Sequence, residues 1–470
     1  MNRIETDVAV IGAGTAGLAA YRAAKAAGKR ALVIEAGSYG TTCARVGCMP
    51  SKLLIAPAEA AHGLERFAAF GLSVDAPLQV DGKAVMARVR RERDRFVGFV
   101  VRGVDEIPAE DKIVGFATFV DDHTLTIDSG TTVVAKAVVI ATGSTPSYPP
   151  TWNALGDRLI VNDHLFDFDD LPRSIAVFGP GVIGLELGQA LHRLGVRVKV
   201  FGRGGGVGPI GDPVVLKEAR RIFLREFYLD TDAHADVARD GDEVVVTYKA
   251  LDGSPQVERF DYLLAATGRI PNVRHLGLEN TSVERDAHAV PRFDRETLQS
   301  GTSSIFIAGD ASNDTPVLHE AADEGRIAGG NAARYPDVGR GLRRAPIGVV
   351  FTDPQIAIVG GGYRAVQGKA IVTGTVSFED QGRSRVMMRN QGLLHVYAER
   401  GTGLFLGAEM IGPDAEHIAH LLAWSLQMKC TIAQMLEMPF YHPVVEEGLR
   451  TALRDAQAQL DAAALERKAA

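Results

Sequence analysis

The sequence predicts an α/β protein in which two similar strand–helix–strand units are followed by a smaller C-terminal α+β domain. The first observation behind this prediction is a glycine pattern, G-x-G-x-x-G, that occurs twice, each time between an apolar strand and a helix. The second is a change of character near residue 345, after which short apolar strands lead into helices. A length of 470 residues leaves room for about three domains.

The composition indicates which classes of protein this chain can belong to. Hydrophobic residues make up 46% of the chain and charged residues 23%, as in an ordinary globular protein. The formal net charge of -7 argues against nucleic acid as a partner. We expect no membrane partner, because no apolar run approaches the ~20 residues that a spanning helix needs. The absence of a signal peptide and the presence of only three cysteines favour a reducing, cytoplasmic compartment.

The first unit contains every part of a dinucleotide fingerprint in order. An apolar strand over residues 8–11 leads into the glycine pattern and then into a helix over 18–27. The three glycines let a pyrophosphate approach the backbone at the helix N-terminus; they are Gly12, Gly14 and Gly17. The next strand ends on Glu35, an acid at the right distance to bind an adenosine ribose. This unit is therefore predicted to be a Rossmann-like dinucleotide site.

The second unit repeats the pattern between a strand over 175–178 and a helix over 185–194. Its glycines are Gly179, Gly181 and Gly184. Two complete fingerprints in one chain imply two dinucleotides. The expected acid is missing, since Gly202 and Arg203 follow the next strand. An arginine can accept a 2′-phosphate, so NADP(H) stays open beside NAD, with a merely solvent-exposed Arg203 as the other interpretation.

Further cofactor contacts are expected where buried strands end. A strand over 137–140 leads into a turn at Gly143, and a strand over 262–266 repeats this arrangement at Gly268. Asp310 follows a strand over 305–308, where its carboxylate would bind a cofactor hydroxyl. Between these motifs we predict a helical segment (56–104), a hairpin (114–127) and a linker (146–156).

The stretch from Gly40 to Lys52 holds two of the three cysteines, Cys43 and Cys48. They are close enough in sequence to be bridged if the backbone bends. So short a loop gains little stability from a bridge, which suits a disulfide that opens and closes. Two unrelated buried thiols are the alternative. The spacing is not one used for zinc, and we predict no metal site.

The C-terminal part is predicted to form a mixed sheet followed by helices. His442 and Pro443 precede an acidic pair that includes Glu447. The last segment, 448–465, is amphipathic and is either an exposed tail or a partner-binding helix.

Taken together, these motifs resemble the class I pyridine nucleotide-disulfide oxidoreductases, the flavin disulfide reductases, over essentially the whole chain. The cysteine stretch ends in Pro-Ser-Lys, which is nearer to the lipoamide and mercuric branches than to the glutathione branch. Thr41 and Arg45 depart from the family's usual residues. Only one other cysteine, Cys430, lies further along, which counts against mercuric ion as substrate. The departures leave substrate choice open.

The resemblance implies an FAD-binding domain (1–150), an NAD(P)-binding domain (151–275), a segment returning to the FAD domain (276–345) and a dimerisation domain (346–470). It implies a homodimer and a small dithiol or disulfide substrate, with dihydrolipoamide or a protein-bound lipoyl group expected first. An NADPH-dependent reductase of another small disulfide is the alternative. A docking subunit of a multienzyme complex and a thiol-independent transhydrogenase explain fewer of the motifs.

The resemblance also implies roles for individual residues. Cys43 would exchange with substrate, and Cys48 would face the flavin as a thiolate. His442 would act as the base and Glu447 would orient it, both from the second subunit. Lys52 would lie near the reactive edge of the flavin and pair with Glu186. The remaining glycines and acids named above would bind the two cofactors.

Overall fold

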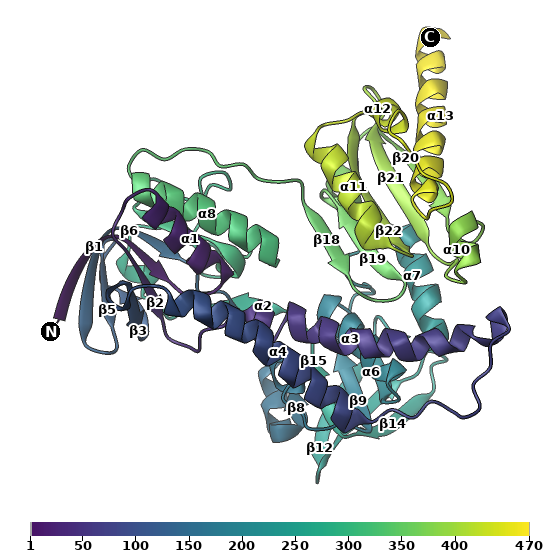
Figure 1. The fold of residues 1–470 in the computed structure, drawn as a ribbon, viewed down its shortest axis with the longest axis horizontal. Coiled ribbons are helices and arrows are strands. Elements are labelled where there is room, and N and C mark those ends of the chain that lie inside the picture. Colours follow the sequence, from purple (N-terminus) through teal and green to yellow (C-terminus); the bar gives the residue numbers. More distant parts are fainter. Residues whose placement is uncertain (1, 470) are drawn as a thin grey trace. The chain divides into compact units, whose positions relative to one another are not determined.

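The computed structural model describes residues 2–469, and the chain divides into two compact units (Figure 1). The first unit comprises Met1–Pro50, Arg90–Ser147 and Gly268–Arg343. The second comprises Ser51–Val89, Tyr148–Thr267 and Arg344–Ala470.

The first unit is built on a sheet in the order β3-β2-β1-β6-β5-β4, with β17 added beside β6. Strands β1, β2, β3, β6 and β17 run parallel, whereas β4 and β5 form an antiparallel hairpin at one edge. The strands are β1 (Asn2–Ile11), β2 (Ala31–Glu35), β3 (Lys112–Val114), β4 (Ala117–Phe119), β5 (Thr124–Ile127), β6 (Thr131–Ile140) and β17 (Ile305–Ile307). The apolar parts of the central strands, residues 8–11 of β1, 31–34 of β2, 137–140 of β6 and 305–307 of β17, are buried, as expected of a parallel sheet covered on both faces.

Helices α1 (Thr15–Ala26) and α8 (Leu318–Arg334) lie side by side on this sheet (Figure 1). Their backbones approach closely because α8 carries glycines at the contact. A Cβ atom on Gly325 or Gly329 would come within 2.2 Å of the carbonyl oxygen of Ala16 or Ala20, respectively. The glycines of α8 therefore allow this helix to lie directly against the first half of α1.

In the second unit, the dinucleotide-binding part is a five-stranded parallel sheet in the order β11-β10-β9-β15-β8, beside a three-stranded antiparallel sheet. Its strands are β8 (Leu159–Ile160), β9 (Ser174–Phe178), β10 (Arg197–Phe201), β11 (Tyr228–Asp230), β12 (Ala235–Asp240), β13 (Glu243–Lys249), β14 (Pro255–Phe260) and β15 (Tyr262–Ala265). Helices α6 (Val182–Arg193) and α7 (Pro213–Glu226) contribute to the core.

The C-terminal part is a five-stranded sheet in the order β18-β19-β22-β21-β20. Every neighbouring pair is antiparallel, so the predicted mixed sheet is wrong. β18 pairs with β19, and β20, β21 and β22 form a meander whose last strand pairs with β19. No parallel crossover is needed. Its elements are β18 (Ile347–Val350), β19 (Gln355–Val359), β20 (Ile371–Ser377), β21 (Leu393–Glu399), β22 (Phe405–Gly412), α11 (Ala415–Gln427), α12 (Ile432–Leu436) and α13 (Glu447–Ala469).

Helix α13 packs on this sheet and is not the exposed tail that the sequence left open. Leu449 and Leu453 are buried in the same core as the strands. The backbone N–H of Thr375 in β20 donates to Asp455 at 2.8 Å. The amphipathic pattern therefore reflects packing on the chain's own sheet.

One other prediction needs correction. Residues 56–104 are not one helical segment, because α3 (Cys48–Gly63) and α4 (Gly82–Asp105) are separated by two short 3-10 turns and a loop that begins at Gly71 (φ +74°). The predicted linker (146–156) contains the boundary between the two units, after Ser147. Regular structure lies on both sides of this boundary: β7 (Ser144–Pro146), which pairs with β16 (Arg269–Pro271), and η4 (Pro150–Arg158). The remaining short helices are α2 (Thr42–Arg45), η1 (Leu64–Arg66), η2 (Ala68–Phe70), η3 (Ala109–Asp111), α5 (Asn162–Leu165), η5 (Leu278–Asn280), η6 (Gly309–Ser312), α9 (Gly362–Val366) and α10 (Gly382–Val386).

Candidate active site

The first glycine loop joins β1 to α1. A Cβ on Gly12 (φ +106°) would lie 2.3 Å from the carbonyl oxygen of Ala141, and one on Gly17 would lie 1.8 Å from that of Gly12. A Cβ on Gly14 would meet no protein atom within 4 Å. The space beside Gly14, at the N-terminus of α1, therefore fits a pyrophosphate, which is what FAD presents there. The residues of this loop suit that cofactor.

The second glycine loop, between β9 and α6, has the same geometry. A Cβ on Gly179 (φ +107°) would lie 2.2 Å from the carbonyl oxygen of Ala266, and one on Gly184 would lie 1.9 Å from that of Gly179. Gly181 faces open space, as Gly14 does. The repeated geometry makes this loop a second dinucleotide cradle.

The two loops differ at the acid. The carboxylate of Glu35 accepts hydrogen bonds from the N–H groups of Ala13 and Gly37, both at 2.7 Å. Gly202 stands in the corresponding place, because Gly12 N donates to Ile34 O and Gly179 N donates to Phe201 O in the same register.

No acid fits at position 202. A Cβ there would lie 2.6 Å from the ring of Pro180 and 2.9 Å from the carbonyl oxygen of Thr231. Pro180 also replaces Ala13, so the N–H that holds Glu35 in the first loop is missing from the second. The neighbouring Arg203 is exposed. The Pro180–Gly202 pair is a signal that sequence reasoning missed, although comparing the two fingerprints could have found it.

The two cysteines of the stretch from Gly40 to Lys52 lie on different helices. Cys43 is half-buried in α2, and Cys48 is exposed at the first position of α3. A helix N-terminus stabilises a thiolate through its unpaired N–H groups and dipole. Thr41, which caps α2 by accepting from Ala44 N, has a φ of +59°. Glycine adopts a positive φ more easily than threonine does. The departure from the family pattern at Thr41 therefore places a side chain at a position where the backbone favours glycine.

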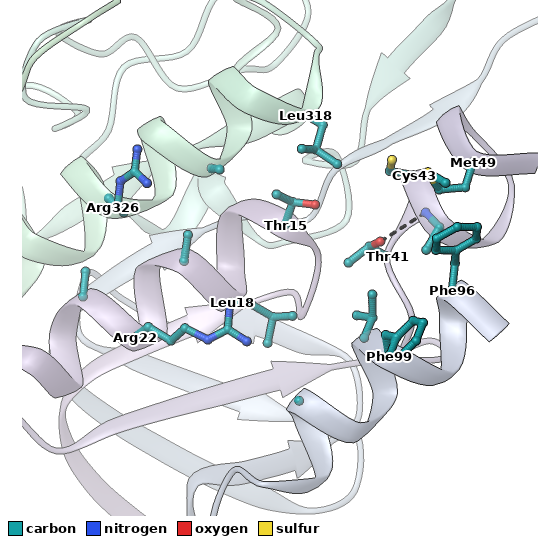
Figure 2. Close-up of a pocket in the computed structure, with 16 residues that line it drawn as sticks. Thr15, Leu18, Arg22, Thr41, Cys43, Met49, Phe96, Phe99, Leu318 and Arg326 are labelled. Carbon is teal, nitrogen blue, oxygen red and sulfur yellow. Dashed lines mark hydrogen bonds between the residues drawn. The ribbon is translucent and has the colours of Figure 1, made fainter. Parts of the chain in front are cut away.

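Cys43 lines a cavity of about 790 Å³ in the first unit (Figure 2). The walls come from α1, α4, α8 and the cysteine stretch, and most of them are apolar, including Phe96, Phe99 and Leu318. Two arginines, Arg22 of α1 and Arg326 of α8, also contribute to the lining. The cavity is large enough for a small organic molecule to reach the Cys43 side of the stretch.

Lys52 and Glu186 form an ion pair in the second unit. Lys52 Nζ lies 2.7 Å from Glu186 Oε2, and the Glu186 side chain is only 4% exposed. Glu186 Oε1 accepts from the N–H of Phe351, whose ring centroid lies 4.5 Å from Lys52 Nζ. The carboxylate thus holds the ammonium group in place on α3, four residues after Cys48.

A hydrogen-bond chain holds Asp310 in the first unit. Ser144 Oγ donates to Asp310 Oδ2 at 2.7 Å, and Arg269 Nε donates to Ser144 Oγ at 2.8 Å. Strands β7 and β16 bring Ser144 and Arg269 together immediately after Gly143 and Gly268. These glycines have φ values of +70° and +123°. Sequence reasoning missed Ser144 and Arg269, although both stand directly after the glycines that it identified.

His442 and Glu447 lie together in the second unit. His442 Nδ1 is 2.9 Å from Glu447 Oε2, and Arg450 donates to Glu447 Oε1 at 2.9 Å. Desolvation raises the pKa of Glu447, but the hydrogen bonds from His442 and from Val444 N, with the charges of His442 and Arg450, lower it by more, so the net shift is downward. The His442 side chain is 80% exposed. The imidazole is therefore oriented by a carboxylate and still accessible to a second molecule.

Within residues 2–469, no helix combines the length and apolarity required to cross a membrane. The same residues hold no group of three or more His, Cys, Asp or Glu side chains placed to bind a metal ion.

Comparison with known proteins identifies two matching domains. Residues 6–325 match the model of the pyridine nucleotide-disulphide oxidoreductase family. Residues 347–453 match the dimerisation domain of the same family. The second match supports a homodimer. FAD and NAD(P) are the cofactors of this family, in agreement with the two glycine loops.

Individual relatives cover nearly the whole chain. A mercuric reductase from Shigella flexneri is 30% identical over 95% of this chain and 80% of its own length. A dihydrolipoyl dehydrogenase from Geobacillus stearothermophilus is 28% identical over 94% of both chains. The crystal structure of LpdA from Mycobacterium tuberculosis has a TM-score of 0.81 at 25% identity, covering 97% of this chain and 99% of its own. The fold, the paired nucleotide loops and the family matches agree, and the chain belongs to the class I pyridine nucleotide-disulfide oxidoreductases.

Proposed function

We propose that this protein passes two electrons between a dithiol and NAD(P)+ through a Cys43–Cys48 disulfide and FAD. The observation that carries the proposal is that Cys43 lines a cavity while Cys48 begins the helix that carries Lys52. One cysteine is thus accessible to a substrate, and the other lies at a helix N-terminus that favours a thiolate.

The chemistry is thiol–disulfide exchange. A substrate thiolate attacks Cys43 Sγ and displaces Cys48 as a thiolate, and the second substrate thiol then displaces Cys43 to give oxidised substrate and two protein thiols. Bound FAD supplies the two-electron relay from these thiols to the nicotinamide. Lys52, held by Glu186, would stabilise negative charge that develops near the flavin.

A proton must leave the substrate thiol before it can attack. His442 is suited to accept it, since an imidazole titrates near neutrality and Glu447 orients the ring through Nδ1. The exposure of His442 and the dimerisation domain support a site to which a second subunit contributes the base.

Dihydrolipoamide, free or as a protein-bound lipoyl group, is the first substrate to test, because several relatives are dihydrolipoyl dehydrogenases. The mainly apolar lining around Cys43 suits its hydrocarbon chain.

A second candidate is an NADPH-dependent reductase of another small disulfide. Two observations favour it: the second nucleotide loop has no room for an acid at Gly202 beside the exposed Arg203, and Arg22 and Arg326 line the cavity. The arginines would suit a substrate that carries carboxylates.

Anaerobic titration of the holoenzyme with NADH, NADPH and dihydrolipoamide tests the proposal. A long-wavelength absorption band after two electrons that disappears in Cys48→Ser is the expected result. Reduction of the flavin that is unaffected by Cys43→Ser and Cys48→Ser would refute the role of the cysteines. A strong preference for NADPH would favour the second candidate over a dihydrolipoamide dehydrogenase.

A further inference from the structure

Glu324 of α8 is a buried carboxylate directly behind the expected flavin contact. Its side chain is fully buried, and Oε2 accepts a hydrogen bond from the N–H of Gly309 at 2.7 Å. Gly309 immediately precedes Asp310 in η6. The hydrogen bond that Gly309 N–H donates to Glu324, with a longer one from Ser312 Oγ (3.5 Å), therefore fixes the backbone from which Asp310 projects.

The same carboxylate lies close to the N-terminus of α1. A Cβ on Gly309 (φ +70°) would lie 2.9 Å from the Cβ of Ala16, in the first turn of α1 and two residues beyond Gly14. Gly309, which donates to Glu324, thus packs against the end of α1 where the pyrophosphate of FAD fits. Like charges in a poorly solvated region repel strongly.

The charges around Glu324 do not balance. Arg343 Nη2 is shared by Glu324 (2.9 Å), Glu320 (3.0 Å) and Asp314 (3.3 Å). Asp314 also pairs with Arg295. The cluster of Glu320, Glu324, Asp314, Arg295 and Arg343 therefore carries one carboxylate more than its guanidinium groups can neutralise.

The other charged groups nearby have their own partners or lie further away. Asp323 pairs with Arg326, and Asp310 accepts from Ser144. On α1, the residue that contacts this region is Ala16, and Arg22 and Lys25 follow about two turns later. Excess negative charge is expected to be relieved by protonation of the most buried carboxylate.

The electrostatic balance agrees with this geometry. Burial raises the pKa of Glu324 to about 7, even though Arg343 and the Gly309 N–H lower it, while Asp314 and Glu320 raise it further. The ordinary pKa of a glutamate is about 4.3. Glu324 therefore changes charge in the neutral range, and a nearby dianion would shift that change to higher pH.

We propose that Glu324 is a positioning residue of the FAD site and that FAD binding is coupled to its protonation. The neutral carboxyl group keeps an oxygen that accepts from Gly309 N–H. The backbone at Gly309 therefore holds Asp310 in place whether Glu324 is protonated or ionised. The neutral form does not repel the pyrophosphate. FAD binding is then accompanied by uptake of a proton from solvent, and the affinity for FAD falls as pH rises above neutrality.

The test is FAD release from the full-length holoenzyme. Diluted holoenzyme is brought to equilibrium at intervals between pH 5.5 and 8.5, and the fluorescence of free FAD gives the dissociation constant at each pH. The wild-type constant should be level at the acid end and should rise by up to about tenfold per pH unit above neutrality. Glu324→Gln, which keeps an acceptor for Gly309 but cannot ionise, should give a level curve.

Glu320→Gln is the matched control, since Glu320 also binds Arg343 but makes no bond to Gly309. Because it removes one negative charge that raises the pKa of Glu324, it should move the rise to lower pH without abolishing it. Arg343→Gln removes the shared counter-charge and should move the rise to higher pH, which keeps the proposal testable if Glu324→Gln fails to fold. A level wild-type curve, or the same rise in Glu324→Gln as in the wild type, would overturn the coupling. Neither result depends on which disulfide the enzyme uses.

Discussion

The ammonium group of Lys52 and the carboxylate of Glu186 lie 2.7 Å apart, although 134 positions separate the two residues in the sequence. The pair joins the helix that begins at Cys48 to the helix of the nicotinamide fingerprint. It therefore ties α3 to α6 within the second unit.

Glu186→Gln should destabilise the protein and slow reduction of the flavin by NAD(P)H. The amide keeps the acceptor for Phe351 N but leaves Lys52 without its counter-charge, at a cost of roughly 1–2 kcal/mol in the free energy of unfolding. Urea unfolding and stopped-flow reduction measure the two effects. Ser51→Ala is the control, because Ser51 also contacts Lys52 Nζ, at 3.3 Å, but carries no charge. An equal loss in both variants would argue against the ion pair.

Asp212 should make stability depend on acid pH. Burial raises the pKa of Asp212, but the hydrogen bonds and charge of His395 and the hydrogen bond of Tyr397 lower it by more, to about 2. A carboxylate with a lowered pKa contributes stability above its unfolded pKa of 3.8 and loses it as pH falls towards 2. The contribution is roughly 2 kcal/mol.

Asp212→Asn tests this dependence, because asparagine can still cap α7, where Asp212 accepts from Val214 N. The free energy of unfolding of the wild type should exceed that of the variant near pH 6, and the difference should shrink between pH 4 and pH 2. A difference that stays constant over this range would show that Asp212 stabilises the fold by packing alone.

Local motifs explain which parts of the molecule could be predicted from sequence. Both glycine loops depend on strand, turn and helix within about 30 residues, and their elements could be recognised from periodicity and glycine spacing. The partners of Glu324 and the approach of Pro180 to Gly202 depend on tertiary packing. The spacing of residues in the sequence does not predict such contacts.

The direction of the C-terminal strands shows the same limit. Each strand could be recognised as an apolar run, but an apolar run does not predict which strand it pairs with or in which direction. The 3-10 turns and the loop between α3 and α4 were likewise hidden, because the two helices stand close together in the sequence and the residues between them remain partly apolar.

Gly202→Glu and Pro180→Ala together should change the preference between NADH and NADPH, although neither substitution should do so by itself. Gly202→Glu introduces a Cβ that clashes with Pro180, so the single variant should bind either cofactor poorly. Pro180→Ala removes the two ring contacts and leaves only the contact of 2.9 Å with the carbonyl oxygen of Thr231, which must still shift. It also restores an N–H like that of Ala13, which holds Glu35 in the first loop. The double variant should shift the ratio of kcat/KM for NADH over NADPH by at least about tenfold towards NADH.

Pro180→Ala alone is the control and should leave the ratio close to that of the wild type, since it adds no charge. Arg203→Ala should lower kcat/KM for NADPH more than for NADH. If Arg203→Ala changes both cofactors equally, Arg203 does not contact the 2′-phosphate, and NAD becomes the expected cofactor.

The contribution of His442 can be tested with mixed dimers. His442→Gln should lower dithiol oxidation by about 10²–10⁴-fold while leaving FAD bound, because the base is lost and the cofactor loops are untouched. Cys43→Ser should also be inactive. When the two variants are co-expressed with different tags, a base supplied across the dimer gives each purified heterodimer one intact site, with about half of the wild-type activity. A base supplied within one chain leaves the heterodimer inactive, because each chain then lacks one of the two residues. The exposure of His442 on its own chain favours the first outcome.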